Sequence, residues 1–274
     1  SAGQGRAMVS WAVFVVIGVS VAAAAALPSN QYKGVYIGKL STLEHGVTGD
    51  VYAVDNTTVF IEGFSYDGEG PDAFFFAGNK SPKPSSRGFI IPDEHNRNEV
   101  LGPYRNKNII LRFPVTKKGQ RSLDNIKWMS VWCRRFGVNF GDVAIPEGLV
   151  EPSPQVAVGL QSDKPAMSAT SVTLLDTETI EIKDFSFDST VQDAIFVVGS
   201  GDAQSSGSQV LDERGSREPL KEYTHRTMVL SVPKEVQGKP IQYVGVWSPT
   251  VGMISSVTFD PNALLPPSID SLIK

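Results

Sequence analysis

The residues best suited to chemistry in this sequence are a cysteine and the two arginines that follow it. Trp132, Cys133, Arg134 and Arg135 are consecutive, and Cys133 is the only cysteine among the 274 residues. Guanidinium groups beside a thiol favour the thiolate, which is the reactive form. On a β-strand, however, neighbouring side chains point to opposite faces. The sequence therefore leaves two interpretations open, a redox-active thiol and an inert thiol buried beside Trp132.

A second candidate is an acidic, glycine-rich segment that follows a run of apolar residues. Tyr66, Asp67, Glu69 and Asp72 lie within seven consecutive positions. Their carboxylates could hold a calcium ion or accept hydrogen bonds from sugar hydroxyls. Aspartate and glycine are also the residues that a tight turn requires. A related segment later in the chain keeps two of the acids and loses the glycines, which favours a role in shaping the turn.

Other chemistry is hard to find in the sequence. The histidines His45, His95 and His225 lack the spacing of metal ligands, so no metal site is predicted. A nucleophile elbow, a phosphate loop and a dinucleotide fingerprint are all missing from the sequence. The net charge of −4 argues against a nucleic-acid partner, which would select a basic face. These features predict a non-enzymatic protein without a cofactor.

The elements that position these candidates belong to a fold that the chain uses twice. The segment Phe64–Phe75 recurs 121 residues later as Phe185–Phe196, and Val131-Trp132 recurs as Val246-Trp247. Small changes in the offset fall where Gly, Pro, Ser and charged residues cluster, as loop deletions do. A period of about 118 residues is too long for a solenoid unit, so each copy should be a complete domain. Ser248 stands in the second copy where the first has Cys133.

Both copies are expected to be all-β. Short β-branched and aromatic runs lie between turn signals, without a convincing helical period, which predicts two tandem β-sandwich (or barrel-like) domains. We expect the first domain at 32–150, a Pro-rich linker at 151–154 and a second, divergent domain at 155–268. The expected strands are 49–54, 58–62, 73–77, 108–113, 127–133 and 137–145, then 171–175, 180–182, 194–198, 227–232 and 242–247.

The start of the chain predicts secretion. An apolar run ends in Ala24-Ala25-Ala26 before Leu27-Pro28, which fits upstream residues and a secretory signal peptide at 1–26. An uncleaved anchor is the alternative, but the run is interrupted and barely long enough to span a bilayer, so we expect no membrane span after cleavage. In a secreted chain Asn56 and Asn79 become candidate glycosylation sites, because each begins an Asn-X-Ser/Thr triplet.

Four motifs together resemble a known family. Phe64–Phe75, Ile91–Glu94, Ile126–Cys133 and Phe140–Pro146 occur in the order found in the DM-thirteen domain. Tandem copies of that domain open arthropod proteins of the Knickkopf and Skeletor type. The resemblance covers residues 32 to about 268 and is stronger in the first copy than in the second.

The resemblance implies a location and two alternative functions. Such proteins are extracellular, associate with chitin in the cuticle, and organise or protect it, so chitin or cuticle matrix proteins are the implied partners. In this domain the cysteine matching Cys133 is proposed as a redox centre, acting as a bare thiol or holding a prosthetic group such as haem. A secreted, non-catalytic cuticle protein is therefore our leading expectation. A cell-surface electron-transfer or thiol-redox module is the alternative.

The two copies are expected to differ in function. The first keeps Gly68, Gly70 and Cys133, whereas the second has lost these residues but retains its apolar pattern. Losing two glycines from a tight loop removes positions that accept a positive φ angle, so the second loop should have a different shape. We therefore expect the second domain to be a structural companion and any ligand or redox site to lie within residues 32–150.

Overall fold

Two antiparallel sheets form the first repeat of the computed structural model, which describes residues 31–203 and 206–274. The signal peptide expected at 1–26 lies outside the described residues. One sheet has the order β1-β2-β3-β6, and the other has the order β10-β9-β4-β5. The strands are β1 (Val35–Lys39), β2 (Thr48–Asp55), β3 (Thr58–Tyr66), β4 (Ala73–Gly78), β5 (Phe89–Ile91), β6 (Tyr104–Arg112), β9 (Trp128–Cys133) and β10 (Val138–Ala144).

The core of this repeat lies between the two sheets. Alternate residues of each strand enter it, as the period of two dictates. Strand β9 shows the pattern clearly, because Met129, Val131 and Cys133 all belong to this core. The connections include short turns, the longer irregular segments 79–88 and 92–103, a small hairpin of β7 (Val115–Thr116) and β8 (Gly119–Gln120), and a 3₁₀ turn at Leu123–Asn125. Two packed sheets around one apolar layer confirm the predicted β-sandwich.

The other face of β9 is buried as well. Trp128 and Trp132 form a separate cluster there with Phe76 of β4. The Phe76 ring stacks near both indoles, with centroids 6.3 Å from Trp128 and 6.2 Å from Trp132. The indole N–H of Trp128 donates a 3.1 Å hydrogen bond to the backbone oxygen of Ser81, in the irregular segment after β4. The packing of this aromatic cluster explains why all six residues of β9 are buried rather than every second one.

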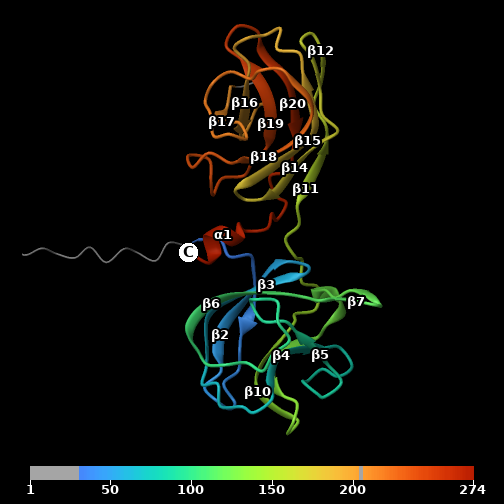
Figure 1. Cartoon of the computed structure of the whole chain (residues 1–274), viewed down its shortest axis with the longest axis vertical. Coiled ribbons are helices and arrows are strands. Elements are labelled where there is room, and N and C mark those ends of the chain that lie inside the picture. Colours follow the sequence, from blue (N-terminus) through green and yellow to red (C-terminus); the bar gives the residue numbers. More distant parts are fainter. Residues whose placement is uncertain (1–30, 204–205) are drawn as a thin grey trace, which may run out of the picture. The chain divides into compact units, whose positions relative to one another are not determined.

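The second repeat also has two sheets. One joins β11-β14-β15-β13-β12, with β18 also paired to β15, and the other has the order β17-β16-β19-β20. Figure 1 draws these strands in yellow to red and those of the first repeat in blue to green. Their bounds are β11 (Gln155–Val158), β12 (Gln161–Asp163), β13 (Ala166–Ser168), β14 (Ser171–Asp176), β15 (Thr179–Phe187), β16 (Ile195–Gly199), β17 (Ser208–Val210), β18 (Tyr223–Ser231), β19 (Tyr243–Ser248) and β20 (Gly252–Thr258), followed by the helix α1 (Ile269–Leu272).

Equivalent backbone contacts show that the two repeats share one fold. The N–H of Leu101 donates to the oxygen of Ala73 over 2.9 Å, and Leu220 donates to Ala194 over 2.8 Å in the second repeat. Positive φ angles also recur at matched positions. Gly63 (63°) corresponds to Asp184 (57°), and Asn106 (48°) corresponds to His225 (48°). The predicted tandem repeat is therefore one of structure as well as sequence.

Candidate functional site

The acidic loop after β3 is packed against one end of the first sandwich. Tyr66 ends β3, is 2% exposed, and accepts a 2.8 Å hydrogen bond from the backbone N–H of Gly70. A Cβ atom on Gly70 would lie 2.5 Å from both the Tyr66 hydroxyl and the Phe140 ring. Gly68 has a φ of +82° and lies against Pro103. The two glycines are therefore required by close packing and by a left-handed backbone conformation.

The carboxylates of this loop have separate partners. Asp67 accepts a 2.8 Å hydrogen bond from the backbone N–H of Glu69, which closes a tight turn, and its other oxygen lies 3.0 Å from Nδ1 of His45. Asp72 forms a 3.1 Å ion pair with Arg134. Within 31–203 and 206–274, no three His, Cys, Asp or Glu residues are grouped so as to hold a metal ion. The geometry supports a turn rather than a calcium site.

Cys133 lies in the core beneath this loop. It ends β9, pairs with Ala73 on one side and Val138 on the other, and has no exposed surface. Trp132 faces away from the sandwich core, so the two residues do not pack side by side. Burial raises the pKa of the Tyr66 phenol, and negative charge on Asp67 or on Cys133 raises it further. Tyr66 and Cys133 both belong to the core between the two sheets.

The two arginines interact with other groups. Arg134 lies in the turn after β9, where its guanidinium group is 4.2 Å above the ring of Phe74 and pairs with Asp72. The guanidinium group of Arg135 lies 5.7 Å from the centroid of the Phe136 ring. Phe136 is 64% exposed, so this contact is at the surface. The contacts seen for both guanidinium groups are therefore with Phe74, Asp72 and Phe136, and none is with the thiol.

A haem group does not fit at Cys133 as the residues are packed. A porphyrin bound through a thiolate needs open space on one side of the sulfur. The thiol of Cys133 is fully buried, and the loop above it has no room for a methyl group between Gly70, Tyr66 and Phe140. A haem ligand would therefore require the loop and the end of the core to separate.

Sequence reasoning missed one member of this cluster, His45. Its ring lies 4.2 Å from Phe140 and 6.1 Å from Tyr66 between centroids, and its Nδ1 faces the Asp67 carboxylate. His45 has a φ of +55°, in the left-handed region. Because these contacts join the loop before β2 to β10, nearly 100 residues away, local sequence gave no signal for them. The absence of a matching histidine in the second copy was the available signal.

The second repeat replaces the whole cluster. The backbone N–H of Asp188 bonds to the oxygen of Ala166, as that of Asp67 bonds to His45, so Ala166 corresponds to His45. Phe187, Val191 and Ser248 replace Tyr66, Gly70 and Cys133, and the bulge in β20 places Ile254 where β10 has Phe140. In the first repeat His45, Tyr66, Gly70 and Phe140 contact one another, Cys133 belongs to the same core as Tyr66 and Phe140, and all five differ in the second repeat. The cluster of His45, Tyr66, Gly70, Cys133 and Phe140 therefore behaves as one unit, which we call the thiol cluster.

At the position of the thiol, the second repeat makes a hydrogen bond instead. The hydroxyl of Ser248 is fully buried and donates to Oδ1 of Asp193 over 2.5 Å. The hydroxyl of Thr250 donates to the other oxygen of the same carboxylate. These bonds lower the pKa of Asp193, with the Ser248 bond making the largest contribution. Ser248 therefore anchors the turn after β19, a structural role.

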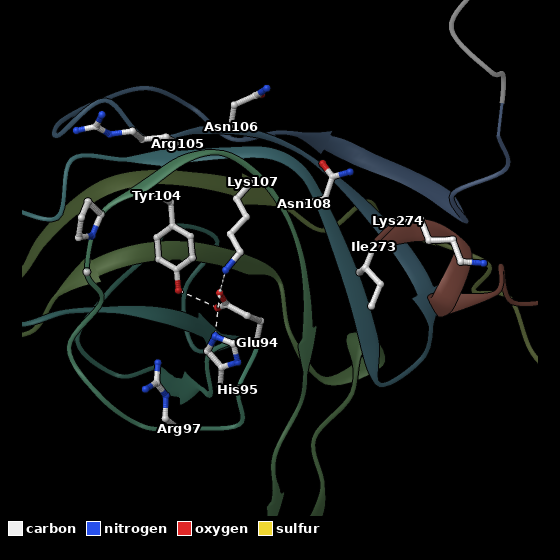
Figure 2. Close-up of a pocket in the computed structure, with 12 residues that line it drawn as sticks. Glu94, His95, Arg97, Tyr104, Arg105, Asn106, Lys107, Asn108, Ile273 and Lys274 are labelled. Carbon is white, nitrogen blue, oxygen red and sulfur yellow. Dashed lines mark hydrogen bonds and ion pairs between the residues drawn. The ribbon is translucent and has the colours of Figure 1, made fainter.

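A polar groove of about 750 Å³ lies beside β6 in the first repeat. Figure 2 shows Tyr104 and Lys107 both pointing toward Glu94, to which they donate hydrogen bonds of 2.8 and 2.7 Å. Burial opposes ionisation of Glu94, but these bonds outweigh it and lower its pKa. The second repeat keeps the tyrosine bond, in which Tyr223 donates to Glu213 over 3.1 Å. Burial and Glu213 raise the pKa of Tyr223 to about 12. Recurrence in both repeats indicates a structural network.

Comparison with known proteins gives relatives for most of the chain. Over 219 residues it is 42% identical to the Drosophila melanogaster protein Skeletor, both to isoforms B/C and to isoforms D/E. That alignment covers 79% of this chain, but only 27% and 14% of the two relatives, so the chain spans a minor part of their length. No solved structure matches the chain.

Two further findings bear on the class of protein. Across the part of the chain that the structure describes, no helix is long and apolar enough to cross a membrane. The sequence pattern of the family described as "Electron transfer DM13" matches residues 39–145 and again residues 160–253. These two segments comprise more than half of the chain and coincide with its two β-sandwich repeats. The chain belongs to the DM13 family, of which it carries two tandem copies.

Proposed function

We propose that this chain is a secreted, non-catalytic protein of a chitin-containing extracellular matrix such as cuticle, in which it takes part in organising or protecting chitin. The observation that carries the proposal is the pair of DM13 repeats shared with Skeletor at 42% identity. The closed packing of Cys133 and the separate partners of the loop acids support a non-catalytic role.

Retention on chitin beads tests this proposal. The secreted chain is incubated with the beads and washed, with bovine albumin as the control protein. Retention clearly above that of albumin supports direct binding to the polysaccharide. Retention equal to that of albumin counts against direct binding. The same assay with cuticle extract added then reports whether a matrix protein mediates the association.

A second candidate function is electron transfer at the cell surface. The specific observation in its favour is that the first repeat alone has both a cysteine, Cys133, and a phenol, Tyr66, in its buried core. Thiol–disulfide exchange requires that a second sulfur reaches the first. With a fully buried thiol, this function would need electrons to pass through neighbouring side chains.

Two measurements on the purified chain separate the candidates. A haem-loaded protein absorbs visible light, and a redox thiol reacts with a thiol reagent in the native state. A colourless protein whose thiol reacts only after denaturation supports the matrix role and removes the thiol-exchange form of the alternative. Visible absorbance, or prompt reaction of the native thiol, supports the redox candidate instead.

A further inference from the structure

The two Asn-X-Ser/Thr triplets lie in different structural settings. Asn56 forms the turn between β2 and β3, where its Nδ2 donates a 2.6 Å hydrogen bond to Oδ2 of Asp124. Its own Oδ1 is buried. N-linked glycosylation attaches the sugar to this same Nδ2 atom. A glycan on Asn56 would therefore have to leave through the contact with Asp124.

Other parts of the Asn56 triplet are also engaged in the fold. The N–H of Leu123 donates a 2.8 Å hydrogen bond to the backbone oxygen of Asn56, and Leu123 is 1% exposed in the core. Thr58, whose hydroxyl completes the triplet, is 4% exposed. The 3₁₀ turn that carries Leu123 and Asp124 thus packs directly on the triplet. A branched sugar at this position would displace that turn.

Asn79 lies in the opposite kind of setting. It follows the last residue of β4 and is exposed, as is Lys80 after it. Ser81 completes the triplet and is partly exposed, while its backbone oxygen anchors the segment by accepting the indole N–H of Trp128. The asparagine therefore projects from a fixed position at the surface. A glycan attached there would displace no part of the core.

We propose that Asn79 is the N-glycosylation site of this chain and that Asn56 is not glycosylated in the folded protein. The inference rests on the secretion part of the proposed function, because the sugar donor is a lipid-linked oligosaccharide of the secretory pathway. In the reaction Nδ2 of Asn79 forms a bond to C1 of the first sugar. The bond from C1 to the lipid pyrophosphate breaks, and the amide loses one proton.

Pro82 follows this triplet directly. A proline restricts the residue before it to extended conformations, and here that residue is Ser81, whose hydroxyl the transferase must engage. We therefore expect incomplete occupancy, visible as two bands of the secreted protein. Pro82→Ala should increase the glycosylated fraction, because it removes this restriction without altering the triplet.

The test is to express the full chain in a human cell line behind a heterologous secretory leader and to treat cells and medium with peptide N-glycosidase F. The leader separates this test from the question of whether the chain's own first residues direct secretion. Denaturation before the digest makes the readout independent of the stability of each variant. Asn79→Gln and Ser81→Ala each remove the Asn79 triplet, and Asn56→Gln and Thr58→Val each remove the other. Ser85→Ala is the matched control in the same segment.

The expected result is a single enzyme-sensitive shift in the wild type. It should be lost in Asn79→Gln and Ser81→Ala, and kept in Asn56→Gln, Thr58→Val and Ser85→Ala. A shift that persists in Asn79→Gln, or disappears in Thr58→Val, would overturn the assignment. A secreted wild type with no shift would overturn it as well. None of these three outcomes alters the expectation of retention on chitin, so failure here is distinguishable from failure of the proposed function.

Discussion

The backbone N–H of Gly70 donates a hydrogen bond of 2.8 Å to the hydroxyl of Tyr66, and this bond closes the loop above the buried thiol. A methyl group on residue 70 would lie 2.5 Å from that hydroxyl and from the ring of Phe140. Such distances cannot persist between non-bonded heavy atoms, so the neighbours would have to move. The loop is thus closed by packing and by a hydrogen bond together.

Gly70→Ala should therefore lower the free energy of unfolding by about 1–3 kcal/mol, the usual effect of overpacking a filled site. Gly102→Ala is the matched control, because a Cβ at Gly102 meets nothing within 4 Å. That variant should stay within about 0.5 kcal/mol of the wild type. Urea unfolding followed by tryptophan fluorescence measures both. Equal midpoints for the two variants would show that the loop is not closed as described.

The thiol of Cys133 should be unreactive in the native chain, and neither arginine should influence it. An aromatic disulfide reagent is expected to titrate one thiol per chain in denaturant and essentially none without it, because the sulfur has no exposed surface. Arg134→Ala and Arg135→Ala should leave the native rate unchanged. The exposed Arg134–Asp72 pair contributes at most about 1 kcal/mol to stability, so both variants should remain folded. If the reaction of the native thiol slowed in either variant, that result would show that the arginine activates the thiolate.

Stability in acid should depend on Asp93. Burial opposes its ionisation, but bonds from the side chain and backbone of Arg97 and from the backbone of His95 outweigh this and lower its pKa below the usual range for an aspartate. A lowered folded pKa adds stability above the unfolded pKa, and that stability is lost as the pH falls through the folded value. The urea midpoint should hold steady above about pH 5 and fall below pH 4.

Asp93→Asn should flatten that acid dependence in part and cost on the order of 1–3 kcal/mol at pH 7, because it weakens the bonds that Arg97 makes. The acid dependence should be lost only in part in this variant, since Asp212 holds the equivalent position in the second repeat and its pKa is also lowered. Urea midpoints at several pH values for the wild type and the variant check this. Parallel curves would contradict a role for Asp93.

Most of the central strands could be predicted from the sequence, and the edge strands largely could not. The expected run at 73–77 became β4, and that at 127–133 became β9, because continuous apolar residues mark strands buried on both faces. β20 was not predicted, since Gly252 to Thr258 is largely half-buried and carries small polar residues in place of alternating apolar ones. β1 and β11 are also edge strands, whose weaker patterns resemble loops.

The site was predictable only in part, because its contacts are long-range. The repeat identified the loop with its two glycines and the loss of Cys133 in the second copy. The sequence left open whether Cys133 is buried or activated, because the answer depends on the position of the Arg134 guanidinium group. Strand β9 ends at Cys133, so the alternation of side chains along a strand does not give that position. His45 reaches Phe140 across the sandwich, a contact set by the fold as a whole. Positions that differ between the two repeats identified the site better than local sequence patterns did.

A chitin-binding isotherm for the secreted wild type and for Cys133→Ala tests most directly whether the chain binds matrix chitin through folded domains in which the thiol has a structural role. Cys133→Ala removes one buried atom and should cost roughly 1 kcal/mol, so the variant should remain folded. Both proteins should co-sediment with insoluble chitin above an albumin control, with equal affinity and capacity. Loss of retention in folded Cys133→Ala, or no retention of the wild type above albumin, would contradict this function.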